Sequence, residues 1–85
     1  MPRNQIKDTE MMIELGEVFR QERLKQEMYI DTVATRARIT RNTLYSIEQP
    51  RGSSIGLTTA LDITAALGMS PQKIIDIYEK HRSAA

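Results

Sequence analysis

Short stripes of apolar residues at helical spacing, separated by turn-forming residues, constrain the fold of this chain more than any other feature. Apolar side chains recur every three or four residues from Met11 to Phe19, and the same spacing returns in shorter segments further along the chain. This periodicity predicts amphipathic helices, and no segment alternates as a half-buried strand would. A chain of 85 residues allows one domain, so we expect an all-α fold of five short helices around one core.

Capping and turn residues set the expected bounds of these helices. Residues 1–8 are polar and contain a proline, so we expect a flexible N-terminal arm, with Asp8 and Thr9 as candidate caps of the first helix. Residues 81–85 include the single histidine and are expected to fray as a solvated tail, which leaves residues 9–80 as the domain. The other helices are expected at 29–37, at 41–49 between the N-cap Thr40 and Pro50, from Leu57 to the left-handed cap Gly68, and from Ser70 and Pro71 onward.

The core is expected to be mostly aliphatic, because the chain has one phenylalanine, three tyrosines and no tryptophan. The fifth helix carries more apolar surface than a closing helix needs, so part of it is a candidate for a two-fold dimer interface. The alternative is that all of it belongs to the core. The expected apolar faces are Met11, Met12, Leu15, Val18 and Phe19 in the first helix, Leu57, Ala60, Leu61, Thr64 and Leu67 in the fourth, and the interface candidates Ile74, Ile75, Ile77 and Tyr78 in the fifth.

The composition argues against several classes of protein. Without cysteine the chain can have neither a disulfide framework nor a thiolate metal site. Its glycines are scattered at 16, 52, 56 and 68 and form no phosphate-binding loop. No His, Asp and Glu cluster has ligand spacing, so we assign no metal, no cofactor and no enzymatic activity. No apolar run approaches the roughly 20 residues of a membrane helix, and the N-terminus lacks the apolar segment of a secretory signal. We therefore expect a cytoplasmic protein with no membrane contact.

The distribution of charge is more informative than the net charge of +1. Between residues 35 and 52 the chain carries the arginines Arg36, Arg38, Arg41 and Arg51 and a single acid, Glu48. A local basic patch on a nearly neutral chain is typical of a small nucleic-acid-binding domain. On charge alone, an ordinary solvated surface is the simpler interpretation.

Two short helices separated by a brief turn, with the small residue Ala34 where they would cross, suit a helix-turn-helix. Around these two helices the chain carries, in this order, Leu15-Gly16, Arg20, Arg23, Val33-Ala34, Ile39-Thr40, Leu44-Tyr45-Ser46-Ile47-Glu48 and Leu67-Gly68. In the types and spacing of these residues, from about Leu15 to Ile75, the sequence resembles the Cro/repressor-type helix-turn-helix family, also called the Xre family. The loop and fourth helix, with Leu57-Thr58-Thr59, are also similar to antitoxins of the HipB type. The resemblance implies a compact, five-helix, lambda-repressor-like DNA-binding domain.

The resemblance also implies roles for particular residues. It makes 41–49 the recognition helix, whose N-terminal end enters the major groove, and it makes Arg23 and Glu48 an ion pair between the first and third helices. Arginine can pair with guanine and asparagine with adenine. The base-reading candidates are Arg41, Asn42, Ser46 and Tyr45, and the phosphate-binding candidates are Arg36, Arg38, Thr40, Thr43, Arg51 and Ser53.

Four positions depart from the residues that are common in the family. Glu27 and Arg38 stand where glycine is usual, so Arg38 must take a left-handed conformation if the turn keeps its shape. Ile30 replaces a glutamine that often contacts phosphate, and Pro50 replaces a glycine after the third helix.

The expected function is that of a sequence-specific transcriptional regulator that binds double-stranded DNA, with repression as the expected mode. A homodimer on a palindromic operator fits this class. Two alternatives stay open, and the departures at Ile30 and Arg38 support the first of them. One is a protein-binding module that has lost DNA binding, and the other is an antitoxin that binds both its operator and a toxin.

Overall fold

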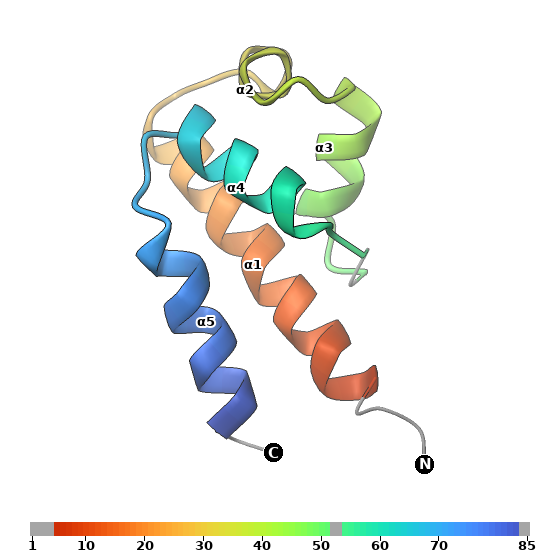
Figure 1. Ribbon diagram of the computed structural model, residues 1–85. Helices are drawn as coiled ribbons and strands as arrows, with labels where there is room; N and C mark the ends of the chain where they lie inside the picture. Colours follow the sequence, from red (N-terminus) through yellow and green to blue (C-terminus); the bar gives the residue numbers. More distant parts are fainter. Residues whose placement is uncertain (1–4, 52–53, 84–85) are drawn as a thin grey trace.

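The helix α1 (Gln5–Lys25) is the longest element, and the other helices are arranged around it (Figure 1). The computed structural model describes residues 5–51 and 54–83, with side chains from Thr9 onward. All regular secondary structure in this part of the chain is helical, which confirms the expected all-α fold with five helices. The other helices are α2 (Ile30–Ala37), α3 (Arg41–Glu48), α4 (Leu57–Ala66) and α5 (Gln72–Ser83).

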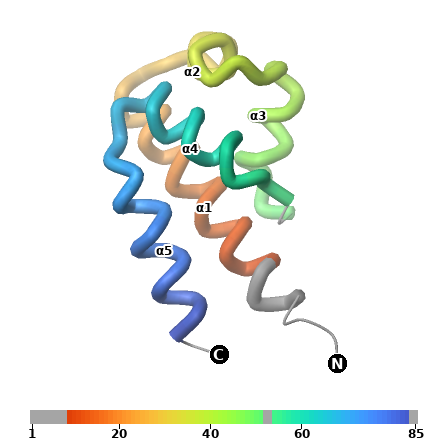
Figure 2. The backbone as a smooth tube through the Cα atoms, viewed as in Figure 1, coloured from red at the N-terminus to blue at the C-terminus, as the bar shows by residue number. Residues whose placement is uncertain are grey.

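Helices α2 and α3 lie at one end of the molecule, opposite the start of α1 and the end of α5 (Figure 1). α5 runs antiparallel to α1 (Figure 2), and the two helices are in contact. α1 also contacts α3, while α2 packs on both α3 and α4. The pair α2–α3 is therefore held from two sides, by α1 and by α4.

The ends of the helical domain differ from the expected bounds. α1 begins at Gln5, before the candidate caps Asp8 and Thr9, and residues 1–4 of the expected arm lie outside the described residues. α5 continues to Ser83, so residues 81–83 are helical instead of frayed. The reason is a set of contacts with α1: His81 Nε2 lies 2.7 Å from Oε1 of Glu14, and Lys80 Nζ donates to Oε2 of the same carboxylate at 3.0 Å.

Three of the described helices end in the same type of turn, closed by a residue in the left-handed conformation. After α1 this residue is Glu27 (φ 56°), after α2 it is Arg38 (φ 62°), and after α4 it is Gly68 (φ 70°). In each turn the next N–H bonds to a carbonyl five residues earlier, as Ile39 does with Ala34 at 3.0 Å. The left-handed conformations expected at Arg38 and Gly68 are confirmed. Glycine adopts this conformation freely, whereas Glu27 and Arg38 adopt it at a cost.

The core is aliphatic except for Phe19, which is fully enclosed together with Leu44 and Ile63. Gly16 allows α3 to approach α1 closely, because a Cβ at this position would collide with the carbonyl oxygen of Ile47. Any larger residue at position 16 would push the two helices apart. The other buried apolar residues are Leu15, Val33, Ala34, Ala37, Ile47, Ala60, Leu67 and Ile77.

The buried face of α4 differs from the expected one. Leu57 keeps 69% of its surface exposed and Leu61 keeps 40%, although both were expected in the core. Ile63 is enclosed in their place, beside Ala60 and Thr64. α4 is apolar on more than one side, so its periodicity did not define a single inward face.

Candidate nucleic-acid interface

The helices α2 and α3 are joined by the turn at residues 38–40, and each is fixed to the core by one face. The hydroxyl of Thr40 accepts the N–H of Thr43 at 3.1 Å, so Thr40 caps α3 as expected. The residues that anchor the two helices are Val33, Ala34 and Ala37 in α2 and Leu44, Ile47 and Glu48 in α3. This two-helix unit therefore presents its remaining side chains on a rigid support.

The side of α3 that faces away from the core is polar and exposed. Asn42 and Thr43 lie open to solvent, and Tyr45 keeps 51% of its surface exposed. Ser46 is only half-buried. With Arg41 at the start of the helix, the four base-reading candidates all have surface that a ligand could contact, and Ser46 has the least.

Arg41, the first residue of α3, is held by an acid from the preceding helix. Its Nε lies 2.8 Å from Oδ1 of Asp31, the second residue of α2. Both side chains are well exposed, at 63% for Arg41 and 70% for Asp31. The ion pair bridges the N-terminal ends of the two helices on the outside of the molecule.

The phosphate-binding candidates differ in their exposure to solvent and in the hydrogen bonds that they already make within the protein. Arg36, Arg38 and Arg51 are all exposed. The hydroxyls of Thr40 and Thr43 lie 2.8 Å apart and share a hydrogen bond, so part of their capacity is used within the cap. Ser53 lies outside the described residues.

Arg23 and Glu48 form the expected ion pair between α1 and α3. Nε of Arg23 donates to Oε2 of Glu48 at 2.9 Å, and Nη2 donates to Oε1 at 2.8 Å. A third nitrogen, Nη1, donates to the carbonyl of Met28 at 3.0 Å. The hydrogen bonds to Glu48 raise the pKa of Arg23, although its partial burial opposes the shift. The one acid between residues 35 and 52 is thus buried and neutralised, and the charges that this stretch exposes are arginines.

The four interface candidates of α5 divide into two groups. Ile77 is buried and Ile74 packs against the core, whereas Ile75 and Tyr78 are about half exposed, at 49% and 50%. The alternative that all four belong to the core is therefore wrong.

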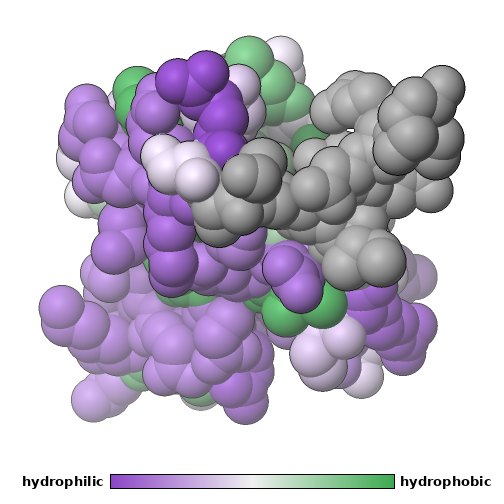
Figure 3. Space-filling model, turned by 90° about the horizontal axis from the view of Figure 1, so that it is seen from below, coloured by the Kyte–Doolittle hydropathy of each residue, from purple (hydrophilic) through white to green (hydrophobic). Residues whose placement is uncertain are grey.

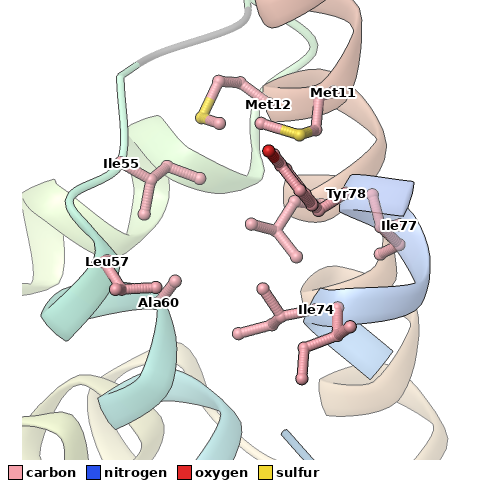
Figure 4. A pocket seen from close by; sticks show the side chains of 10 residues that line it. Met11, Met12, Ile55, Leu57, Ala60, Ile74, Ile77 and Tyr78 are labelled. Carbon is pink, nitrogen blue, oxygen red and sulfur yellow. The ribbon is translucent and has the colours of Figure 1, made fainter. Parts of the chain in front are cut away.

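Ile75 and Tyr78 border an apolar groove of about 350 Å³ between α1, α4 and α5. Ile55 and Leu57 line one wall, and Ile74 and Tyr78 lie across from them (Figure 4). The end of the molecule with the last turn of α5 is different: its surface is mostly hydrophilic, with small hydrophobic areas between polar side chains (Figure 3). We call the exposed residues Leu57, Ile75 and Tyr78 the α4–α5 apolar face.

Two features of the α2–α3 end of the molecule were not predicted from the sequence. Asp31 was visible as an acid in the first turn of α2, but its partner Arg41 was not, because the pair depends on the angle between the helices. Tyr29 was expected inside the second helix, but it is the residue before α2 and is 81% exposed.

Comparisons of the chain with protein-family models, with curated proteins and with solved structures found no match. The resemblance to the Cro/repressor-type family therefore stays a prediction that rests on the residues named above. Among the described residues, no helix has both the length and the apolar character needed to cross a bilayer.

Proposed function

We propose that this chain is a sequence-specific double-stranded DNA-binding regulator in which α2 and α3 act as a helix-turn-helix of the Cro/repressor type. One observation carries the proposal: α3 is anchored on one side by Leu44, Ile47 and the Arg23–Glu48 pair, and offers Arg41, Asn42 and Tyr45 on the other. A surface helix fixed in this way can enter a major groove without moving its support.

The chemistry of the exposed residues suits base reading. Arginine can donate two hydrogen bonds to O6 and N7 of guanine, and asparagine can pair with N6 and N7 of adenine. Arg41 and Asn42 are the first two residues of α3, and the N-terminal end of a recognition helix is the part that meets base edges. Tyr45 and Ser46 lie one turn further along, where a thymine methyl or a phosphate is the expected partner.

The exposed arginines suit the sugar–phosphate backbone. Arg36 lies in the last turn of α2, Arg38 is the residue that follows α2, and Arg51 follows α3. Each phosphate neutralised by such a residue releases counterions, so the affinity should fall steeply with salt. Because Glu48, the one acid between residues 35 and 52, is neutralised inside the protein, no acid in that range opposes the attraction to phosphate.

The proposed assembly is a homodimer formed through the α4–α5 apolar face, with repression from a palindromic operator. Leu57, Ile75 and Tyr78 are large, exposed and gathered at one groove, and a second copy of the chain would remove them from water. A two-fold axis there would present two copies of α3 to two half-sites. A cytoplasmic location, where a regulator of this type meets its DNA, belongs to the same proposal.

A second candidate function, an antitoxin or another protein-binding module, also rests on the α4–α5 apolar face. A protein partner of different sequence would cover the same residues that a second copy would. The two assemblies differ in what purifies with the chain: a symmetric dimer contains one polypeptide, whereas an antitoxin complex contains a second.

Selection of binding sites from random duplex DNA tests the proposed function. The protein should enrich a consensus with two symmetric half-sites whose centres lie about 10–10.5 base pairs apart, or a multiple of that spacing. Enrichment of no sequence, with binding that depends only on salt, would contradict sequence-specific recognition and favour the protein-binding module.

A further inference from the structure

Asp31 of α2 forms an ion pair with the base-reading candidate Arg41 of α3. Its Oδ1 lies 2.8 Å from Nε of Arg41 while both residues stay largely exposed. An exposed ion pair of this kind adds little to folding stability. Its position, between the first turn of α2 and the first residue of α3, places it at the edge of the proposed DNA-binding surface.

The contact between Asp31 and Arg41 joins Oδ1 to Nε, the guanidinium nitrogen nearest the side-chain stem. A guanidinium has five N–H groups in a planar fork, and the ion pair to Asp31 is made through Nε. Nη1 and Nη2 can then approach O6 and N7 of guanine end-on. An arginine that is already oriented loses less side-chain freedom when it binds a base.

The charge of Asp31 has a second consequence. A carboxylate in contact with Arg41 opposes the approach of phosphate at every DNA sequence. The negative charge therefore weakens sequence-independent binding, which depends on the net number of phosphates neutralised. Orientation of Arg41 and repulsion of phosphate act in the same direction, because both increase the difference between the specific site and random DNA.

We infer that Asp31 is a positioning residue that sets specificity: it orients Arg41 toward a guanine and disfavours binding to DNA of other sequence. This inference rests on the proposed function. A structural role, in which Asp31 only favours the N-terminus of α2, would leave DNA discrimination unchanged and alter only the melting temperature.

The experiment compares Asp31→Ala and Asp31→Asn with wild type on the selected site, its single-base variants and random duplex at several salt concentrations. Asp31→Ala should bind random duplex several-fold more tightly. At the base position where Arg41→Ala broadens the preference, Asp31→Ala should lose several-fold of the discrimination between bases. A bidentate pair provides roughly 5- to 150-fold discrimination in total. Asp31→Asn should also bind random duplex more tightly but keep more of that discrimination, since its amide oxygen can accept a hydrogen bond from the guanidinium of Arg41.

Asp62→Ala is the matched control, because it removes one exposed carboxylate from α4 and leaves the Arg41 pair intact. It should not change discrimination at that position. The double variant Asp31→Ala/Arg41→Ala should discriminate no worse there than Arg41→Ala alone, because Asp31 acts through Arg41.

Different results would contradict the inference about Asp31 and the proposed DNA-binding function. If wild type selects a site and Arg41→Ala broadens it, but Asp31→Ala keeps full discrimination, the inference about Asp31 is wrong and the proposed function stands. Losses that add in the double variant would also overturn the inference, because Asp31 would then act independently of Arg41. If wild type selects no site, both proposals are wrong.

Discussion

Arg23 in α1 binds Glu48 at the end of α3 through two hydrogen bonds of 2.9 and 2.8 Å. Only 14% of the Arg23 side chain and 3% of the Glu48 side chain are exposed. The same guanidinium bonds to the carbonyl of Met28, between α1 and α2. One side chain therefore fixes the last turn of α3 and the entry to α2, the two elements that carry the candidate nucleic-acid interface.

Glu48→Ala should destabilise the fold strongly, because it leaves the mostly buried guanidinium of Arg23 without its counter-charge. Loss of one partner of a buried pair costs about 3–5 kcal/mol, and the lower end applies here since Arg23 keeps some contact with water. Chemical denaturation measures the change. The matched control is Glu79→Ala, which breaks an exposed pair with Arg82 and should cost less than about 1 kcal/mol. Equal effects from the two variants would show that the Arg23–Glu48 pair is not a buried one in solution.

Glu27→Gly should stabilise the protein. Glu27 closes the turn after α1 with φ 56°, a conformation that costs a non-glycine residue roughly 1–2 kcal/mol. Part of that gain is lost to the greater freedom of glycine in the unfolded chain, so a net gain of up to about 1 kcal/mol is expected. Gly68→Ala is the reverse test at φ 70° and should destabilise by a similar amount. A lower melting temperature for Glu27→Gly would contradict the left-handed turn.

The contact between Glu14 and the last turn of α5 predicts a specific dependence on pH. The hydrogen bond from His81, followed by that from Lys80, lowers the pKa of Glu14, and partial burial opposes the shift. A carboxyl with a lowered folded-state pKa stabilises the fold above its ordinary value of about 4.3, and this stability is lost as the pH falls through the folded-state pKa. Glu14→Gln should therefore melt below wild type at neutral pH.

The difference between Glu14→Gln and wild type should shrink as the pH falls through the lowered folded-state pKa of Glu14, because wild type then also carries a neutral side chain at position 14. Glu17→Gln, which removes an exposed carboxylate from the same helix, is the control and should show little change across this range. Melting curves that stay equally separated at all pH values would contradict the account of Glu14.

Ile75→Glu and Leu57→Glu should prevent self-association if the α4–α5 apolar face forms the proposed dimer. Both residues are exposed, at 49% and 69%, so a charge should be tolerated in the monomer and not at a two-fold contact. Sedimentation at micromolar concentration measures the effect. Leu24→Glu is the matched control, since Leu24 is 44% exposed on α1 and does not line the groove. A wild-type chain that sediments as a monomer with and without DNA would contradict the dimer.

Local signals in the sequence predicted some of the turns and caps, although Asp8 and Thr9 lie inside α1 and do not cap it. Thr40 and Gly68 were recognised because capping and left-handed turns select particular residue types. The conformation of Arg38 and the Arg23–Glu48 pair came from the resemblance, since no local rule connects residues that are 25 positions apart.

Features that depend on the angle between helices could not be read from the sequence. α4 is apolar on more than one side, so packing, not periodicity, decides that Ile63 is enclosed and Leu57 exposed. The helical state of residues 81–83 depends on Glu14, which lies far away in the chain. The pair of Arg41 with Asp31 depends in the same way on how α2 crosses α3.

The most direct test of DNA reading by α3 is the affinity of Arg41→Ala/Asn42→Ala for the selected site and for random duplex. We predict that the double variant loses most of the difference between the two, since each bidentate contact provides about 1–3 kcal/mol of discrimination. Arg51→Ala is the comparison. It should select the same sequence, while the slope of log affinity against log salt concentration becomes shallower by about one unit. If the double variant discriminates between the two DNAs as well as wild type, α3 is not the recognition element, and the central claim is wrong.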